Sequence, residues 1–180
     1  MAQAHTYVPF PSTSPPGHSD SLVQLQQSFP SRVDAISPFV DQLMCFIGSV
    51  RTADGSELDI EIALREALVN AVVHGNQGNP RKRVYVVCRC SMDGALSITV
   101  QDQGQGFDIH AMPDPTAPDN RLSAHGRGIY LMRAFMDEVR FEEGGTVVHM
   151  RKKSNARATR PRANREVLCA SQDEHTINSR

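Results

Sequence analysis

Three short segments, in a set order, restrict the fold of this chain more than any other feature. Residues 66–76 read EALVNAVVHGN, a pattern typical of a helix that ends at a glycine. Residues 102–108 read DQGQGFD, which places a carboxylate at a strand end and leads into a glycine turn. Residues 125–129 read HGRGI, a glycine-rich loop that opens another helix. These polar groups can act together only if one domain brings the helix, the strand end and the loop side by side.

Periodic apolar residues predict three helices. The clearest is expected over 57–74, and Gly75 is its expected end. An earlier helix is expected to be capped by Ser31 and to run to Ile47, with Pro38 kinking it or delaying its regular start. A third helix is expected over 126–136. The apolar stripe of the 57–74 helix follows the 3.6-residue period and consists of Ile60, Ala63, Leu64, Ala67, Leu68, Ala71 and Val72.

Alternating apolar residues predict five strands. Two are joined through Asp93 and Gly94, a pair that favours a hairpin turn, and the last two turn at Gly144 and Gly145. Antiparallel neighbours with helices between them predict an α+β fold, built as a two-layer α/β sandwich. The expected strands are 22–29, 84–90, 96–101, 138–142 and 146–152.

Composition divides the chain into three parts. Prolines in the first stretch remove backbone donors, so residues 1–20 are expected to be a flexible leader. Residues 21–153 are expected to form the folded domain, and residues 154–180 a basic, disordered tail. Such a tail could contact an anionic partner, although a solvated end is the commoner outcome for a basic run.

The overall composition indicates a soluble protein in a reducing compartment. An apolar content of 39% and a net charge of −1 are ordinary for a globular domain. The four cysteines lack CxxC spacing, and Cys88 and Cys90, on one face of an expected strand, are expected to be buried thiols. No apolar run of about 18 residues and no signal-like leader are found, so a cytoplasmic location without a membrane partner is expected. The acidic middle of the chain argues against direct nucleic-acid binding.

Glu66 and Asn70 lie one helical turn apart, at the edge of the apolar stripe. A solvated polar edge is one interpretation. The neighbours of Asn70 favour a site, because a carboxamide among alanines, leucines and valines is partly buried and needs partners. Mg²⁺ accepts an amide oxygen alongside waters and phosphates, and a nearby glutamate could accept a hydroxyl proton. His74 is expected to be a hydrogen-bonding residue at the helix end.

Asp102 closes an apolar strand and is followed by Gly104 and Gly106. A plain turn would explain the same residues, because aspartate and glycine both favour turns. The full pattern DxGxGF is more restrictive than a pair of glycines. A carboxylate at the bottom of an apolar pocket can accept the amino group of adenine, and glycines let the backbone pass close to the base.

Gly126, Arg127 and Gly128 begin the third expected helix. Backbone amides at a helix N-terminus form an anion site, and glycines allow phosphates to approach them. The segment matches neither the P-loop nor the dinucleotide pattern of glycines, so a simple flexible turn is the alternative.

Together the three segments resemble the N, G1 and G2 boxes of the GHKL ATPases. Residues 66–71 and 126–139 resemble the free-standing branch of anti-sigma-factor serine kinases, which is RsbW/SpoIIAB-like. The resemblance covers about residues 22–152. It implies a Bergerat (histidine-kinase-like ATPase) fold, with helices on one face of a mixed, mostly antiparallel sheet. ATP would lie between the helices and a lid at residues 109–125.

The resemblance also implies a role for each matching residue. The base of the reaction would be Glu66, and Mg²⁺ would be bound by Asn70. The nucleotide would be held by residues of all three segments, namely Asn70, Asp102, Gly104, Gly106, Gly126, Arg127 and Gly128. Among these, Asp102 would hold adenine and the last three would contact phosphates.

The expected function is that of an ATP-binding anti-sigma factor with serine/threonine-protein kinase activity. Its partners would be a sigma factor, which it sequesters, and an anti-anti-sigma (STAS-type) protein, which it phosphorylates on a serine. Two alternatives stay open. One is an ATP-gated binding module without phosphotransfer, which the proline-rich, acidic residues 112–121 favour, and the other is a detached histidine-kinase-like catalytic domain. A homodimer is also left open.

Overall fold

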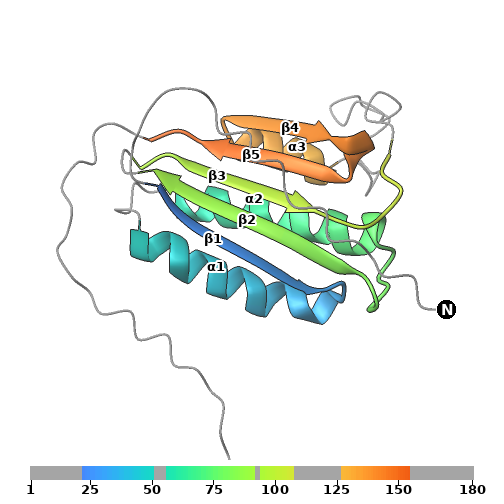
Figure 1. The fold of residues 1–180 in the computed structure, drawn as a ribbon. Helices are drawn as coiled ribbons and strands as arrows, with labels where there is room; N and C mark the ends of the chain where they lie inside the picture. The colour runs from blue at the N-terminus through green and yellow to red at the C-terminus, as the bar shows by residue number, and fades with distance from the viewer. Residues whose placement is uncertain (1–21, 51–55, 92–93, 108–126, 155–180) are drawn as a thin grey trace, which may run out of the picture.

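The computed structural model describes residues 22–50, 56–91, 94–107 and 127–154, which form an α+β domain of two layers (Figure 1). One layer is a five-stranded sheet with the strand order β1-β2-β3-β5-β4. The strands are β1 (Leu22–Pro30), β2 (Arg83–Ser91), β3 (Leu96–Gln101), β4 (Glu138–Glu142) and β5 (Val147–Lys152). The predicted strands are therefore confirmed. Every pairing within the described residues is antiparallel, so the mixed character implied for the sheet is not found there.

The helices form the second layer and cover one face of the sheet (Figure 1). In the described residues they are α1 (Ile36–Val50), α2 (Glu57–Val69) and α3 (Arg127–Phe135). The central helix is α2, which packs against both α1 and α3. It continues into a π-helix over Asn70–Gly75. The predicted helix over 57–74 is thus confirmed in extent, but its last turn is wider than an α-helical turn.

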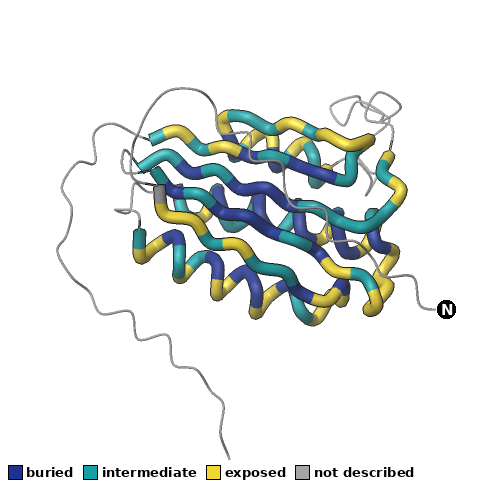
Figure 2. Tube along the Cα trace, in the orientation of Figure 1, coloured by how far each residue is buried: buried dark blue, intermediate teal, exposed yellow. Residues whose placement is uncertain are grey.

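The hydrophobic core fills the space between the two layers (Figure 2). Every residue of the predicted stripe on α2 and its π-helical extension is buried. Alternate residues of the central strands join the same cluster, among them Val86 and Cys88 of β2 and Ile98 of β3. The predicted burial of Cys88 and Cys90 is confirmed. The core therefore holds α2 firmly against the sheet, and α2 carries the first of the three segments.

The start of α1 differs from the prediction. Ser31 does not cap the helix, because its side chain is buried and its Oγ has no hydrogen-bond partner in the described residues. Its backbone N–H instead donates to the carbonyl oxygen of Lys82 at 3.0 Å. A short 3₁₀ turn over Val33–Ala35 then precedes α1. Pro38 lies in the first turn of α1, where its missing N–H needs no intrahelical partner.

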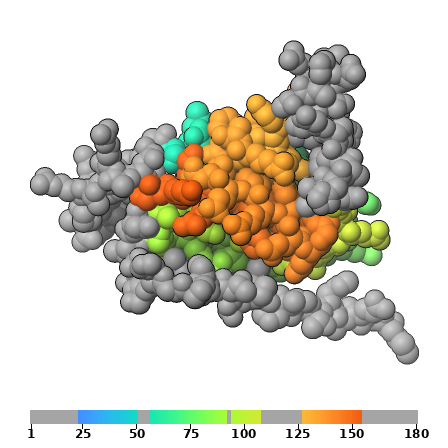
Figure 3. Space-filling view, turned by 90° about the horizontal axis from the view of Figure 1, so that it is seen from above, coloured from blue at the N-terminus to red at the C-terminus, as the bar shows by residue number. Residues whose placement is uncertain are grey.

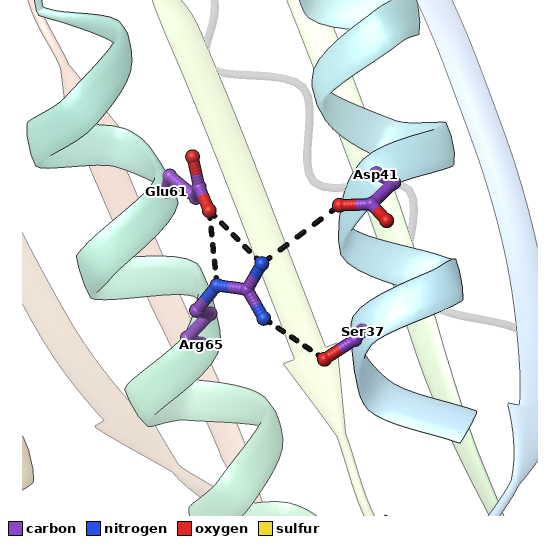
Figure 4. Close-up of polar contacts among 4 residues, drawn as sticks. All are labelled: Ser37, Asp41, Glu61 and Arg65. Atoms are coloured by element: carbon purple, nitrogen blue, oxygen red, sulfur yellow. Dashed lines mark hydrogen bonds and ion pairs between the residues drawn. The ribbon is translucent and has the colours of Figure 1, made fainter. Parts of the chain in front are cut away.

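A polar bridge joins α1 to α2 (Figure 4). Arg65 of α2 donates through Nε to Oε1 of Glu61 at 3.0 Å. It also donates through Nη1 to Oγ of Ser37 on α1 at 3.2 Å, and Nη2 lies 3.8 Å from Oδ1 of Asp41. These side chains are partly exposed, so the bridge contributes little to stability.

One segment of this layer is apolar enough to be compared with a membrane span. Residues Val33–Val50 have the necessary length and a mean hydropathy of 1.3. In the fold, Phe39, Leu43 and Ile47 on one side of this segment belong to the core, whereas Asp41 on the other side is exposed. One side of this segment therefore packs in the core, and 28% of the segment is buried.

Several predictions concern residues outside the described ranges. These are the flexible leader at 1–20, the lid at 109–125, Gly126 and the tail at 154–180, of which only Ser154 is described. They stay predictions, as does the domain boundary near residue 153.

Candidate functional site

The first and third segments meet where α3 begins. Gly128, in the first turn of α3, faces the edge of α2. A β-carbon built at Gly128 would lie 2.8 Å from Oε2 of Glu66 and 3.3 Å from Nδ2 of Asn70. Both side chains are half-buried, beside the stripe as predicted. The absence of a side chain at Gly128 therefore leaves room for α3 to lie close to the carboxylate and the carboxamide, which a β-carbon would crowd.

Contacts at the opposite end of α3 hold it along α2. Lys152 donates through Nζ to the carbonyl oxygen of Phe135, the last residue of α3, at 2.7 Å. The same Nζ lies 3.4 Å from Oδ2 of Asp59 in the first turn of α2. A cation at a helix C-terminus also opposes the helix dipole favourably. Figure 3 shows from above the face that α3, β4 and β5 form together.

The second segment meets the end of the α2 extension rather than its middle. Asp102 follows β3, and its carboxylate lies against Gly75. A β-carbon at Gly75 would lie 2.4 Å from Oδ2 of Asp102, and one at Gly104 would lie 2.2 Å from the carbonyl oxygen of Gly75. The N–H of Gly104 donates to Oδ1 of Asp102 at 2.7 Å. Both glycines therefore make room for this close packing, and Gly104 also donates a hydrogen bond to the carboxylate. Neither contact with Asp102 was foreseen from the sequence, and the predicted place of Gly104 in a base pocket stays a prediction.

The carboxyl group of Asp102 has a strongly raised pKa. Burial raises the pKa of Asp102 from 3.8 to about 6, whereas the hydrogen bond from Gly104 and the positive charge of Lys82 act in the opposite direction. Loss of hydration thus outweighs the stabilising partners. A carboxyl group whose pKa is raised by burial is a candidate for ligand recognition, because a donor on a ligand would stabilise its charged form.

The widened turn between the two clusters is part of their geometry. In a π-helix the hydrogen bonds span five residues, and such turns occur frequently at functional sites. Here the N–H of Asn76 donates to the carbonyl oxygen of Ala71 at 2.8 Å. The π-helix begins at Asn70 and ends at Gly75, so it separates the first cluster from the second along one helix.

Of the remaining candidates, Gly106 lies apart from these two clusters and Arg127 adjoins the first. Gly106 has a φ of 74°, and a β-carbon there would lie 2.0 Å from the carbonyl oxygen of Gly144. The adjacent N–H of Phe107 donates to the same oxygen at 2.8 Å. At Gly106 the glycine turn after β3 therefore packs against the β4–β5 connection, a contact that the sequence did not indicate. Arg127 is exposed beside Gly128.

Sequence reasoning missed one residue that joins these elements. Asn76 is fully buried although it is polar. Its side chain binds two backbone groups from other parts of the chain. The signal was present, since Asn76 follows Gly75 directly and closes the first segment, but no periodicity marks a buried carboxamide there.

The described residues contain no group of three or more His, Cys, Asp or Glu side chains that could hold a metal ion. A multi-carboxylate or thiolate metal centre is thus not found in this part of the chain. The donors that do converge are one carboxylate and one carboxamide, Glu66 and Asn70. This set suits a hard cation that keeps most of its ligands from water and phosphate.

Comparison with known proteins agrees with this geometry. The chain is 36% identical over 99 residues to an anti-sigma F factor of Heyndrickxia coagulans, which covers 51% of this chain and 66% of that protein. It is 40% identical over 101 residues to the serine-protein kinase RsbW of Bacillus licheniformis, covering 52% and 62%, respectively. It is 29% identical over 130 residues to RsbW of Staphylococcus epidermidis, covering 66% and 82%. The alignments with the first two span about two thirds or less of each relative.

The match at the level of the family is broader than any of these alignments. Residues 29–152 match the histidine kinase-like ATPase domain, and this range takes in all the described elements of the domain from the end of β1 to the end of β5. The resemblance inferred from the three segments is confirmed. The chain belongs to the family of histidine kinase-like ATPase domains.

Proposed function

We propose that this protein is an ATP-dependent serine kinase that also acts as an anti-sigma factor. The observation that carries the proposal is the convergence of Glu66 and Asn70 on Gly128 at the start of α3. It places a candidate base and a candidate cation ligand beside a helix N-terminus, where phosphates bind readily. Relatives named as anti-sigma F factors and as serine-protein kinases support both activities.

In this proposal the nucleotide lies along the extension of α2. Asp102 accepts the amino group of adenine, and Gly104 lines the base pocket beside it. The triphosphate lies toward the first turn of α3, near Gly128 and Arg127, with Gly126 as a further contact. The closeness of Gly75 to Asp102 and of Gly128 to Glu66 supports these two ends of the site.

The residues present also fit a magnesium ion, which the family implies. The carboxamide of Asn70 borders a space that a single β-carbon at Gly128 would crowd, and an amide oxygen is a ligand that Mg²⁺ accepts. Asn70 would hold the ion, and the ion would neutralise charge on the phosphates. Because only one protein ligand is assigned, most of the coordination is left to phosphate and water.

Glu66 serves as the general base. Its carboxylate accepts the proton of the substrate serine hydroxyl while the serine oxygen forms a bond to the γ-phosphorus of ATP. The bond between that phosphorus and the β–γ bridging oxygen breaks, and ADP leaves. Such transfer depends mainly on positioning and charge neutralisation, and a positioned base contributes on the order of 10²–10⁴-fold.

The proposed partners follow from the same assignment. A sigma factor is sequestered by the ATP-bound protein, and a serine on an anti-anti-sigma (STAS-type) protein is the phosphate acceptor. The protein acts in the cytoplasm as a regulator of transcription, with a homodimer as its proposed assembly.

The test is incubation of the protein with γ-labelled ATP and a candidate anti-anti-sigma protein. We expect label on a serine, stable in acid, and its loss in Glu66→Gln. Glu61→Gln, on the same helix but paired with Arg65, is the matched control and should keep activity. Sigma-factor binding in ATP without any label would favour the binding module, for which the proline-rich residues 112–121 argue. Acid-labile label would instead indicate transfer to histidine.

A further inference from the structure

Asn76 is a buried carboxamide whose polar atoms all have partners. It is 0% exposed, at the end of the π-helix. Its Oδ1 accepts the backbone N–H of Gln103 at 2.9 Å, and its Nδ2 donates to the carbonyl oxygen of Arg83 at 3.0 Å. A carboxamide suits this position because it both donates and accepts.

The two partners of Asn76 are also bound to each other. The backbone N–H of Arg83 donates to Oε1 of Gln103 at 2.8 Å. The helix end, the first residue of β2 and the loop after β3 are thus joined in a closed ring of three hydrogen bonds. Asn76 lies at the buried side of this ring, and the bond between Arg83 and Gln103 lies at its exposed side. Loss of either Asn76 bond opens the ring, so the helix end and the loop after β3 are no longer tied through it.

The ring lies next to the base-recognition contact. Gly75 precedes Asn76, and Asp102 precedes Gln103. The hydrogen bond between Asn76 and Gln103 therefore also holds Gly75 close to Asp102. Gly75 and the Asp102 carboxylate are already closely packed, since a β-carbon at Gly75 would lie 2.4 Å from the carboxylate. Burial opposes ionisation of that carboxylate, as its raised pKa indicates. Without the ring, the loop after β3 loses its hydrogen bonds to the helix end, and the backbone bond from Asp102 to Thr146 at 3.0 Å does not fix the orientation of the carboxylate toward Gly75.

We propose that Asn76 is a positioning residue for recognition of the purine 6-amino group. It acts through Gln103, by holding the Asp102 carboxylate against Gly75 in the orientation that accepts the amino group. The proposal rests on the proposed function in one respect, that Asp102 meets adenine. It assigns Asn76 to selection of the base and not to the transfer of phosphate, which Glu66 and Asn70 serve.

The test compares ATP with purine riboside triphosphate, which lacks only the 6-amino group. A hydrogen bond to a charged acceptor corresponds to roughly ten- to over a hundredfold in affinity, so wild type should prefer ATP by that factor. In Asn76→Ala we expect this preference to fall to about threefold or less, through weaker binding of ATP alone. Gln103→Ala removes one bond of the ring and leaves the N–H that Asn76 binds, so an intermediate preference is expected.

Controls separate positioning from general destabilisation. Leu43→Ala, in the core at α1, should lower the melting temperature and leave the preference for ATP as in wild type. If Asn76→Ala and Gln103→Ala keep the wild-type preference while only the melting temperature falls, the positioning role is overturned. If Asn76→Ala does not fold, Gln103→Ala alone decides between these results.

The nucleotide comparison, together with the labelling assay, also tests the proposed function separately from the role of Asn76. A wild type that binds both nucleotides equally would overturn the adenine contact of Asp102 and with it this proposal. A wild type that discriminates between them but labels no partner would overturn phosphotransfer and leave the role of Asn76 standing.

Discussion

Replacing Asp102 with asparagine should change stability and nucleotide affinity in opposite directions. The isosteric amide oxygen can still accept the N–H of Gly104, now made at 2.7 Å, so the turn is kept. What is lost is a negative charge that burial disfavours. The substitution therefore removes a charge that lowers the stability of the folded chain and that ATP binding requires.

The pH dependence of stability follows from the raised pKa. Between pH 3.8 and about 6 the Asp102 carboxyl group is deprotonated in the unfolded chain and still protonated in the folded chain. Stability contributed by Asp102 is therefore present at low pH and is lost as pH rises through about 6. The full difference corresponds to about 3 kcal/mol. Because the side chain is partly exposed, solvent screening reduces this, and we expect about 1 kcal/mol in practice.

The assay is thermal unfolding of the nucleotide-free protein at pH 8 and at pH 4, together with ATP titration at pH 8. Asp102→Asn should melt roughly 3–6 °C above wild type at pH 8, and the difference should shrink toward pH 4. ATP affinity should fall roughly ten- to over a hundredfold. Asp41→Asn, an exposed carboxylate on α1, should change neither quantity. A variant that melts below wild type at pH 8 would refute the burial argument, and unchanged ATP affinity would remove Asp102 from the site.

Three further substitutions test the remaining contacts. Asn70→Ala should abolish the tightening of ATP binding by Mg²⁺, and a wild type that binds ATP equally with and without Mg²⁺ would contradict the assignment. Glu66→Gln should bind ATP normally and lose about 10²–10⁴-fold in phosphotransfer rate, so full activity in this variant would exclude the base. Gly75→Ala should weaken ATP binding and lower the melting temperature, because its β-carbon would lie 2.4 Å from Asp102; Gly48→Ala, in open space on α1, should do neither.

Local patterns in the sequence were sufficient for the elements and for most of the candidate site. The apolar stripe of α2 placed Glu66 and Asn70 on one edge of a helix, and the structure confirms this placement. The strand period placed Asp102 at the end of β3. These predictions held because helix and strand periods are set by backbone geometry that neighbouring residues share.

Predictions that depended on distant partners were less successful. Ser31 has the chemistry of a helix cap, but pairing of its backbone with Lys82 keeps it at the end of β1 instead. The close contact of Gly106 with Gly144 likewise had no local signal, and the place of Gly106 in a base pocket stays a prediction. In each case a residue far along the chain decided between two conformations that the local sequence allows equally.

The sequence by itself determined which elements form and which side chains they carry. Only the tertiary structure decided that Gly75 lies against Asp102 and that Asn76 joins the helix end to the loop after β3. The reason is physical. A period along the chain records which face of an element is buried, but a close contact between two backbones, or a hydrogen bond across 27 positions of sequence, leaves no period to detect.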